Sequence, residues 1–197
     1  SIVASYVDRP FTLMERVYTE FRIVVSYLGL LIYLNPGRLN LDHYISVSSS
    51  LFNPVTTVLS ASGIILALVL SAFIAKKQRL VSFAILWYLG NLVIESSFFG
   101  LELIFEHRTY LPSVFVIFAV TVLVNEYIRP KQLAIALLLG AIALCSYWTI
   151  ERNNIWRDPV LFWSDSAAKS PQKARPYMNL SVALREKGAI DEAIIAS

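Results

Sequence analysis

The chain has 197 residues, of which 56% are hydrophobic and 16% are charged, and its formal net charge is +3 at pH 7. An average soluble domain has about 45–50% apolar and about 25% charged residues, and the mean hydropathy of this chain is +0.59. These values exclude an ordinary water-soluble globule, a disordered tail and a disulfide scaffold. They predict an all-α protein that crosses a membrane several times.

The charges and the single cysteine exclude further classes. The basic residues fall in short clusters and not along one face, so we expect no nucleic-acid partner. Cys145 lies in an apolar run and has no second cysteine with which to form an internal disulfide. The chain does not begin with Met, and its last residues follow a helical pattern, so we expect a piece of a longer protein.

Runs with few or no charges predict five membrane-spanning helices in a region that covers residues 1–152. The second run is the clearest, because it carries no charge from Val55 to Ala75. The first run contains Glu20 and Arg22 near its start, where long side chains can reach the membrane surface. The predicted spans cover residues 17–34, 55–75, 80–99, 111–128 and 132–150.

The positions of lysine and arginine predict the orientation of these helices. One basic cluster lies at 76–79 and the next at 129–131, and alternation of the spans puts both on the same side. Basic residues gather on the cytoplasmic side of membrane proteins. The loops 35–54 and 100–112 and the tail after Ile150 are therefore expected on the periplasmic or luminal side, of either a bacterial inner membrane or an ER-type membrane.

The tail, residues 153–197, has the composition and periodicity of packed helices outside the membrane. Its residues match the spacing of the tetratricopeptide (TPR) repeat, in which Gly188 suits the turn between two helices and Ala193 allows close helix packing. A helical hairpin of another kind is the alternative. The matching positions are Tyr177, Leu180, Ser181, Leu184, Gly188, Ala193 and Ser197.

Two polar residues lie inside the third predicted span. A charge at the centre of a membrane helix is costly on insertion, so Glu95 is expected to face protein or a wet cavity, with Asn91 one turn earlier on the same face. They are candidates for the lining of a cavity that holds a polar substrate. The alternative is a neutral, hydrogen-bonded glutamate that ties helices together.

The densest polar cluster precedes the fourth predicted span. Arg108 offers a planar guanidinium that suits a phosphate, and His107 can donate to a phosphate or exchange a proton near neutral pH. Glu106 can orient either residue, and Tyr110 can bond a sugar or anchor at the membrane surface. These four residues are the candidate lipid-phosphate site, and an interfacial loop with internally paired charges is the alternative.

Asp42 and His43 form a second polar pair, in the loop 35–54. They are candidates for the cavity lining, and we expect them mainly to order their loop. A divalent metal shared with Glu106 or His107 is the less favoured alternative, so we predict no metal site and no cofactor.

Several stretches together resemble one family, the transmembrane-and-TPR proteins that include eukaryotic protein O-mannosyltransferases and many bacterial relatives. The loop 108–113 and the order of membrane helices before repeats are the most specific parts of this resemblance. The stretches are Glu15-Arg16-Val17 with Thr19-Glu20, Arg38-Leu39, Asp42-His43, Ser50-Leu51-Phe52, residues 106–113, Trp156-Arg157-Asp158, Leu161-Phe162-Trp163 and Lys169-Ser170-Pro171.

The resemblance implies a glycosyltransferase of the GT-C superfamily that takes sugar from a polyprenyl-phosphate donor on the outer or luminal face. It implies that Arg108 and His107 contact the donor phosphate. Such enzymes place an acidic catalytic residue in the first outer loop, so the catalytic base is expected upstream of this chain. The five spans would be a partial GT-C bundle, and the piece alone is expected to be inactive.

The working hypothesis is therefore part of a membrane glycosyltransferase that acts on a protein or glycan acceptor, with the repeats holding an acceptor or partner protein. The main alternative is a membrane-anchored TPR scaffold without catalytic activity. A transporter that uses Asn91 and Glu95 is a third hypothesis, and the lack of an internal repeat in the membrane half speaks against it.

Overall fold

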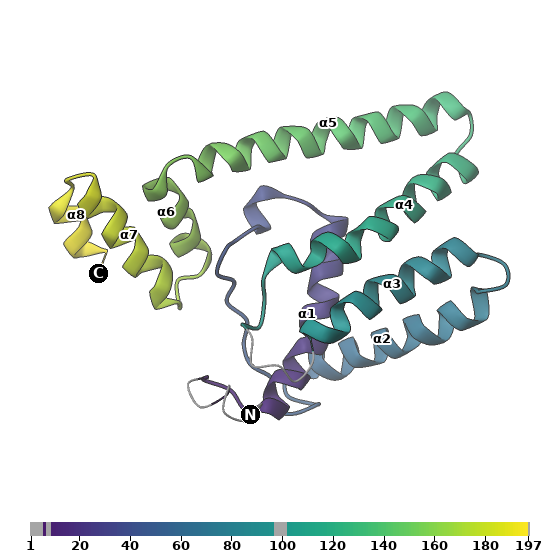
Figure 1. Ribbon diagram of the computed structural model, residues 1–197, viewed down its shortest axis with the longest axis horizontal. Helices are drawn as coiled ribbons and strands as arrows, with labels where there is room; N and C mark the ends of the chain where they lie inside the picture. Colours follow the sequence, from purple (N-terminus) through teal and green to yellow (C-terminus); the bar gives the residue numbers. More distant parts are fainter. Residues whose placement is uncertain (1–5, 7–8, 97–101, 197) are drawn as a thin grey trace. The chain divides into compact units, whose positions relative to one another are not determined.

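The computed structural model describes residue 6, residues 9–96 and residues 102–196 (Figure 1). All the regular elements in these ranges are helices. The α-helices are α1 (Leu13–Ile32), α2 (Val55–Ile74), α3 (Arg79–Glu95), α4 (Tyr110–Tyr127), α5 (Lys131–Trp156), α6 (Pro159–Lys169), α7 (Ala174–Glu186) and α8 (Ile190–Ile195). Two short 3₁₀ helices are η2 (Pro36–Arg38) and η3 (Glu106–Thr109).

The chain divides into two compact units. The first unit contains Ser1–Tyr33 and Ser46–Leu139, and the second contains Leu34–Ile45 and Gly140–Ser197. The boundary after Leu139 falls inside α5, so this helix contributes residues to both units. The segment between α1 and α2 therefore groups with the C-terminal helices, which the sequence did not reveal.

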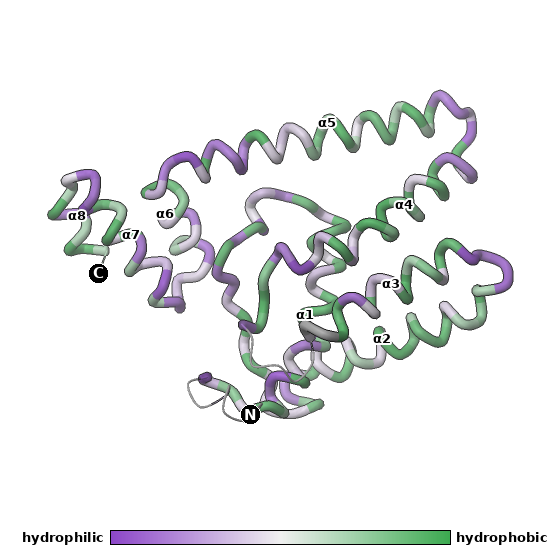
Figure 2. Tube along the Cα trace, in the orientation of Figure 1, coloured by the Kyte–Doolittle hydropathy of each residue, from purple (hydrophilic) through white to green (hydrophobic). Residues whose placement is uncertain are grey.

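Three helical segments are long and apolar enough to cross a membrane, by length and composition: Val55–Ile74, Glu106–Tyr127 and Lys131–Trp156. Few of their residues are buried against the rest of the chain, and Figure 2 shows their mainly hydrophobic course. Exposed apolar surface of this extent is unfavourable in water and favourable in lipid. The molecule thus has the helices of an integral membrane protein.

Helices occupy all five predicted span positions, and two of them differ from the other three. Helix α1 carries four charged residues, and the apolar part of α3, Arg79–Val93, is shorter than a full span. Helix α5 continues to Trp156, six residues beyond the predicted end, because the polar residues after Ile150 extend the helix instead of breaking it.

Hydrogen bonds fix the N-terminal half of α1 in the first unit. The N-terminus has a capping box, in which the Thr12 hydroxyl accepts from the Glu15 N–H and the Glu15 carboxylate accepts from the Thr12 N–H. Arg22 donates to the Ser46 carbonyl oxygen at 2.8 Å. The hydroxyl of Thr19 accepts from the buried Ser48 N–H at 2.8 Å, which joins α1 to the chain that enters α2.

Aromatic packing joins α3 to α4. Phe115 makes edge-to-face contacts with Phe83 and Trp87, with ring centroids 4.8 and 4.9 Å apart. The indole N–H of Trp87 donates to the Leu111 carbonyl oxygen at 2.9 Å. These contacts place the start of α4, and with it the preceding turn η3, against α3.

The second unit contains the helical hairpin formed by α7 and α8, with Gly188 at the turn in the left-handed conformation at φ +81°. Ala193 is buried, as close packing of the two helices requires. Helix α6 packs on α7, and its N-cap residue Asp158 accepts from the Val160 N–H. Ser197 lies outside the described residues.

Candidate functional site

The candidate phosphate residue Arg108 lies in the turn η3, directly before α4. Its guanidinium donates to the Glu102 carbonyl oxygen at 2.9 Å and lies 5.2 Å from the ring centroid of Phe105. Backbone and ring thus hold the side chain in a folded-back position that leaves it half-buried. A guanidinium held in this way is preorganised, so less conformational freedom is lost when it binds an anion.

Tyr27 of α1 forms a hydrogen bond with Phe105, the residue that precedes the turn η3. Its buried hydroxyl accepts from the Phe105 backbone N–H at 2.9 Å. Next to it, the Tyr88 hydroxyl of α3 donates to the Val24 carbonyl oxygen at 2.6 Å. Sequence reasoning missed Tyr27, because a tyrosine inside an apolar helix looks like an ordinary core residue. Its position two turns after Glu20 on one face of α1 was the available signal.

Two more arginines belong to this region, and we name the group of Arg9, Arg16 and Arg108 the arginine cluster. Arg16 is fully buried and pairs with Glu20 at 3.0 Å. Arg9 pairs with Glu102 at 3.1 Å. Arg9 and Arg108 both lie close enough to Arg16 for their charges to oppose its own. Arg9 and Arg16 thus each pair with a carboxylate, and the three guanidinium groups lie near one another.

The other predicted residues of this turn have separate surroundings. His107 is exposed and stacks on Phe105, with ring centroids 5.2 Å apart. Glu106 is half-buried, and its carbonyl oxygen accepts from the Thr109 hydroxyl. Tyr110 is 79% exposed, so it is free of packing against the helices of its own unit. Phe105 is thus the common neighbour of Arg108 and His107.

Of the two candidate residues within α3, the structure describes the side chain of Asn91 only. The Asn91 amide donates to the Trp87 carbonyl oxygen one turn earlier at 2.8 Å, so it bonds to its own helix. Glu95 is the last residue of α3, and its side chain lies outside the described part of the structure.

Asp42 and His43 belong to the second unit, while the four residues of the η3 turn belong to the first. The Asp42 carboxylate is buried and pairs with Lys173 at 3.1 Å, and Arg175 lies 3.8 Å away. His43 is half-buried beside it. Across the described ranges, no group of three or more His, Cys, Asp and Glu side chains is arranged to hold a metal ion.

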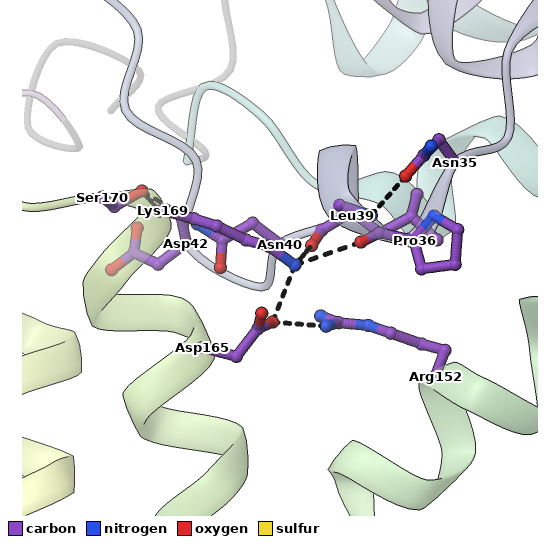
Figure 3. A network of polar contacts seen from close by, with 10 residues as sticks. Asn35, Pro36, Leu39, Asn40, Asp42, Arg152, Asp165, Lys169 and Ser170 are labelled. Carbon is purple, nitrogen blue, oxygen red and sulfur yellow. Dashed lines mark hydrogen bonds and ion pairs between the residues drawn. The ribbon is translucent and has the colours of Figure 1, made fainter.

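Asp42 is part of a wider polar network that the sequence did not reveal (Figure 3). From α6, Lys169 reaches the carbonyl oxygens of Pro36 and Leu39, and Asp165 pairs with both Lys169 and Arg152. Sequence reasoning read Lys169 only as part of a family stretch, since the two carbonyl oxygens that it binds lie 133 and 130 positions away.

Two cavities lie in the first unit. One, of about 250 Å³, is lined by apolar residues of α1 to α4, with Val24, Ala84 and Ala119 among them. The other, of about 450 Å³, lies at the start of α1 beside Arg9 and Phe11. The first is chemically suited to hydrocarbon, and the second has a cation at its edge.

Comparison with known proteins returns no matching family model, no matching curated protein and no matching solved structure.

Proposed function

We propose that the chain is part of a membrane glycosyltransferase that takes sugar from a polyprenyl-phosphate donor and passes it to a protein or glycan acceptor. The observation that carries this proposal is the arginine cluster beside the η3 turn, in a unit built from membrane-type helices. The donor combines an anionic phosphate with a long hydrocarbon chain. A preorganised guanidinium and an apolar cavity in one unit suit these two parts of the donor.

In this proposal, Arg108 stabilises the negative charge that develops on the lipid phosphate as the sugar departs. A fixed cation outside bulk water is effective in this role, because it needs no reorganisation during the reaction. His107, stacked on the same ring, donates a further hydrogen bond to the phosphate. Glu106 and Tyr110 contact the sugar or orient the two basic side chains. A base supplied by another part of the protein deprotonates the acceptor hydroxyl.

The finer architecture belongs to the same proposal. Helices α1 and α3 are the two further spans of a five-span bundle, the polar network of α1 being shielded by its neighbours. The loop 35–54 and the tail after Ile150 lie on the periplasmic or luminal side, and α7 with α8 begins a TPR array that holds an acceptor or partner. Gly188 at the turn and the buried Ala193 support the repeat assignment.

The test is sugar transfer by the full-length protein in membranes, from a polyprenyl-phosphate donor. Arg108→Ala should reduce transfer by roughly 10²- to 10³-fold, the loss seen when one group that stabilises transition-state charge is removed. Arg108→Lys should restore part of it, and Arg79→Ala, at the start of α3, is the matched control. Full transfer by Arg108→Ala at equal expression would contradict the assignment of this residue.

A scaffold without catalytic activity is the second candidate, favoured by exposed apolar side chains on the α7–α8 hairpin. Met178 is 65% exposed and Ile194 is 68% exposed. A scaffold would tolerate Arg108→Ala and lose its protein partners on Met178→Asp. Absence of transfer from every donor in the unmodified full-length protein would favour this candidate.

A further inference from the structure

The segment Leu34–Ile45 connects α1 to α2 in the chain, yet it belongs to the unit of the C-terminal helices. We call this segment the strap. Its two ends join residues of the first unit at Tyr33 and Ser46. Between these ends, the strap makes hydrogen bonds and ion pairs with α6 and the residues that follow it, several of which are drawn in Figure 3.

Lys169 is the central contact of the strap. Its ammonium group donates to the carbonyl oxygens of Pro36 at 3.0 Å and Leu39 at 2.9 Å, and to the Asp165 carboxylate at 2.8 Å. An ammonium has three N–H donors, so each of its donors has an acceptor here. The side chain is largely buried, with 19% exposed. A buried cation with three acceptors is strongly localised, and removing it takes the side-chain donor from the Leu39 carbonyl oxygen and one of two donors from the Pro36 and Asp165 oxygens.

A second contact lies one residue further on. The fully buried Ser170 hydroxyl accepts from the Asn40 amide at 2.8 Å and donates to the Asp42 carbonyl oxygen. The Asp42 carboxylate pairs with Lys173. The strap is thus attached through its backbone and through two side chains, and almost all these groups are buried.

We propose that the strap is a latch that moves with α6 and α7 and not with the flanking helices α1 and α2. The hydrogen bonds and ion pairs of the strap with Lys169, Ser170 and Lys173 are what hold it to these helices. This proposal does not depend on the glycosyltransferase proposal, since it concerns the attachment of the strap alone.

Hydrogen exchange of the full-length protein in membranes tests the latch. The strap amides of Gly37, Arg38 and Leu39 are hydrogen-bonded within the strap and report its order. Lys169→Met removes the three donors and should raise exchange at these amides by about 10-fold or more, since a hydrogen bond to a charged group contributes about 1.5–3 kcal/mol. Lys77→Met, in the exposed turn after α2, is the control and should leave them unchanged.

Added methylammonium provides a second measurement that does not depend on one variant. Lys169→Ala leaves room for a small cation at the same three oxygens. Methylammonium chloride should restore slow exchange in Lys169→Ala, and sodium chloride at equal concentration should not. Exchange that responds to neither variant, or that recovers equally in both salts, would overturn the role of Lys169.

The choice between α6 and α1 is tested by two N-cap variants. Asp158→Ala weakens the start of α6, and Thr12→Ala weakens the start of α1. If the strap moves with α6, its amides exchange faster in Asp158→Ala and are unchanged in Thr12→Ala. Strap exchange that rises in Thr12→Ala, or in neither variant, would overturn the latch.

Discussion

The buried hydroxyl of Tyr27 accepts a hydrogen bond from the backbone N–H of Phe105 at 2.9 Å, across 78 positions of the sequence. The bond joins α1 to the turn that carries Arg108. Tyr27→Phe keeps the ring and removes the acceptor, so the Phe105 N–H loses its partner.

We expect Tyr27→Phe to lower the free energy of unfolding by about 1–3 kcal/mol, the cost of a buried polar group without a partner. Exchange of the Arg108 and Thr109 amides should rise in the same variant. Thermal unfolding in detergent and hydrogen exchange are the measurements. Tyr147→Phe is the control, because Tyr147 is 63% exposed on α5. Equal unfolding temperatures of the two variants would contradict the prediction.

The buried pair of Arg16 and Glu20 gives a second prediction. Each partner is almost fully buried, so Arg16→Met or Glu20→Gln leaves one charge without its counter-charge. We expect each single change to cost about 3–5 kcal/mol, while replacing both costs much less than the sum. A double-mutant cycle of unfolding free energies measures this coupling. Additive costs would show that the two side chains act independently.

The start of α6 gives a pH-dependent prediction. The Lys187 ammonium donates to the Asp158 carboxylate at 2.6 Å, and the pKa of Asp158 is lowered mainly by this bond and further by the Val160 and Leu161 N–H groups. Because the folded pKa lies below the unfolded one, the stabilisation is complete above the ordinary value of 3.8 and is lost as the pH falls through the folded pKa.

Unfolding of the second unit should therefore become easier with falling pH in this acid range. Asp158→Asn keeps an N-cap acceptor for α6 but carries no titrating charge, so its acid dependence should be weaker. Temperature-dependent hydrogen exchange of α6 at several pH values checks this. The same acid dependence in Asp158→Asn would assign the titration to another group.

We expect replacement of Gly188 by alanine to lower stability and replacement of Gly140 by alanine to raise it. Gly188 has φ +81°, a conformation that disfavours residues with a Cβ, so Gly188→Ala should destabilise the α7–α8 hairpin by about 1 kcal/mol. Gly140 lies inside α5, and a Cβ there would meet no atom within 4 Å. Gly140→Ala should stabilise α5 by about 0.5–1 kcal/mol. Local hydrogen-exchange protection measures both, and equal signs would refute the conformational argument.

Helix positions could be predicted because they depend on local pattern. Helix α2 begins at Val55 and ends within one residue of its predicted end, since an apolar run lies between Pro54 and the basic cluster at 76–79. The end of α5 could not be read in this way, because Glu151 and Arg152 continue the helix with polar residues. The change from apolar to polar residues after Ile150 marks the end of the apolar part of α5. The backbone hydrogen bonds of the helix continue beyond that point to Trp156.

The polar contacts could not be predicted, because they join distant positions. Nothing near Asp42 in the sequence indicates Lys173 as its partner, and nothing near Phe105 indicates Tyr27. Arg108 was identified from its residue type, its place in a polar cluster before the fourth predicted span and the resemblance of residues 108–113, whereas its proximity to Arg9 and Arg16 depends on the tertiary structure. The sequence therefore pointed to one residue of the arginine cluster, Arg108, and the other two, Arg9 and Arg16, became apparent only from the tertiary structure.

The chain has a single cysteine, Cys145, half-buried on α5. A spin label attached to this thiol reports on one helix of this chain, α5. Paramagnetic relaxation by oxygen, which concentrates in lipid, and by a water-soluble nickel chelate measures the immersion depth of that one turn. The depth of Cys145 would then calibrate how far the polar end of α5, from Glu151 to Trp156, projects out of the bilayer.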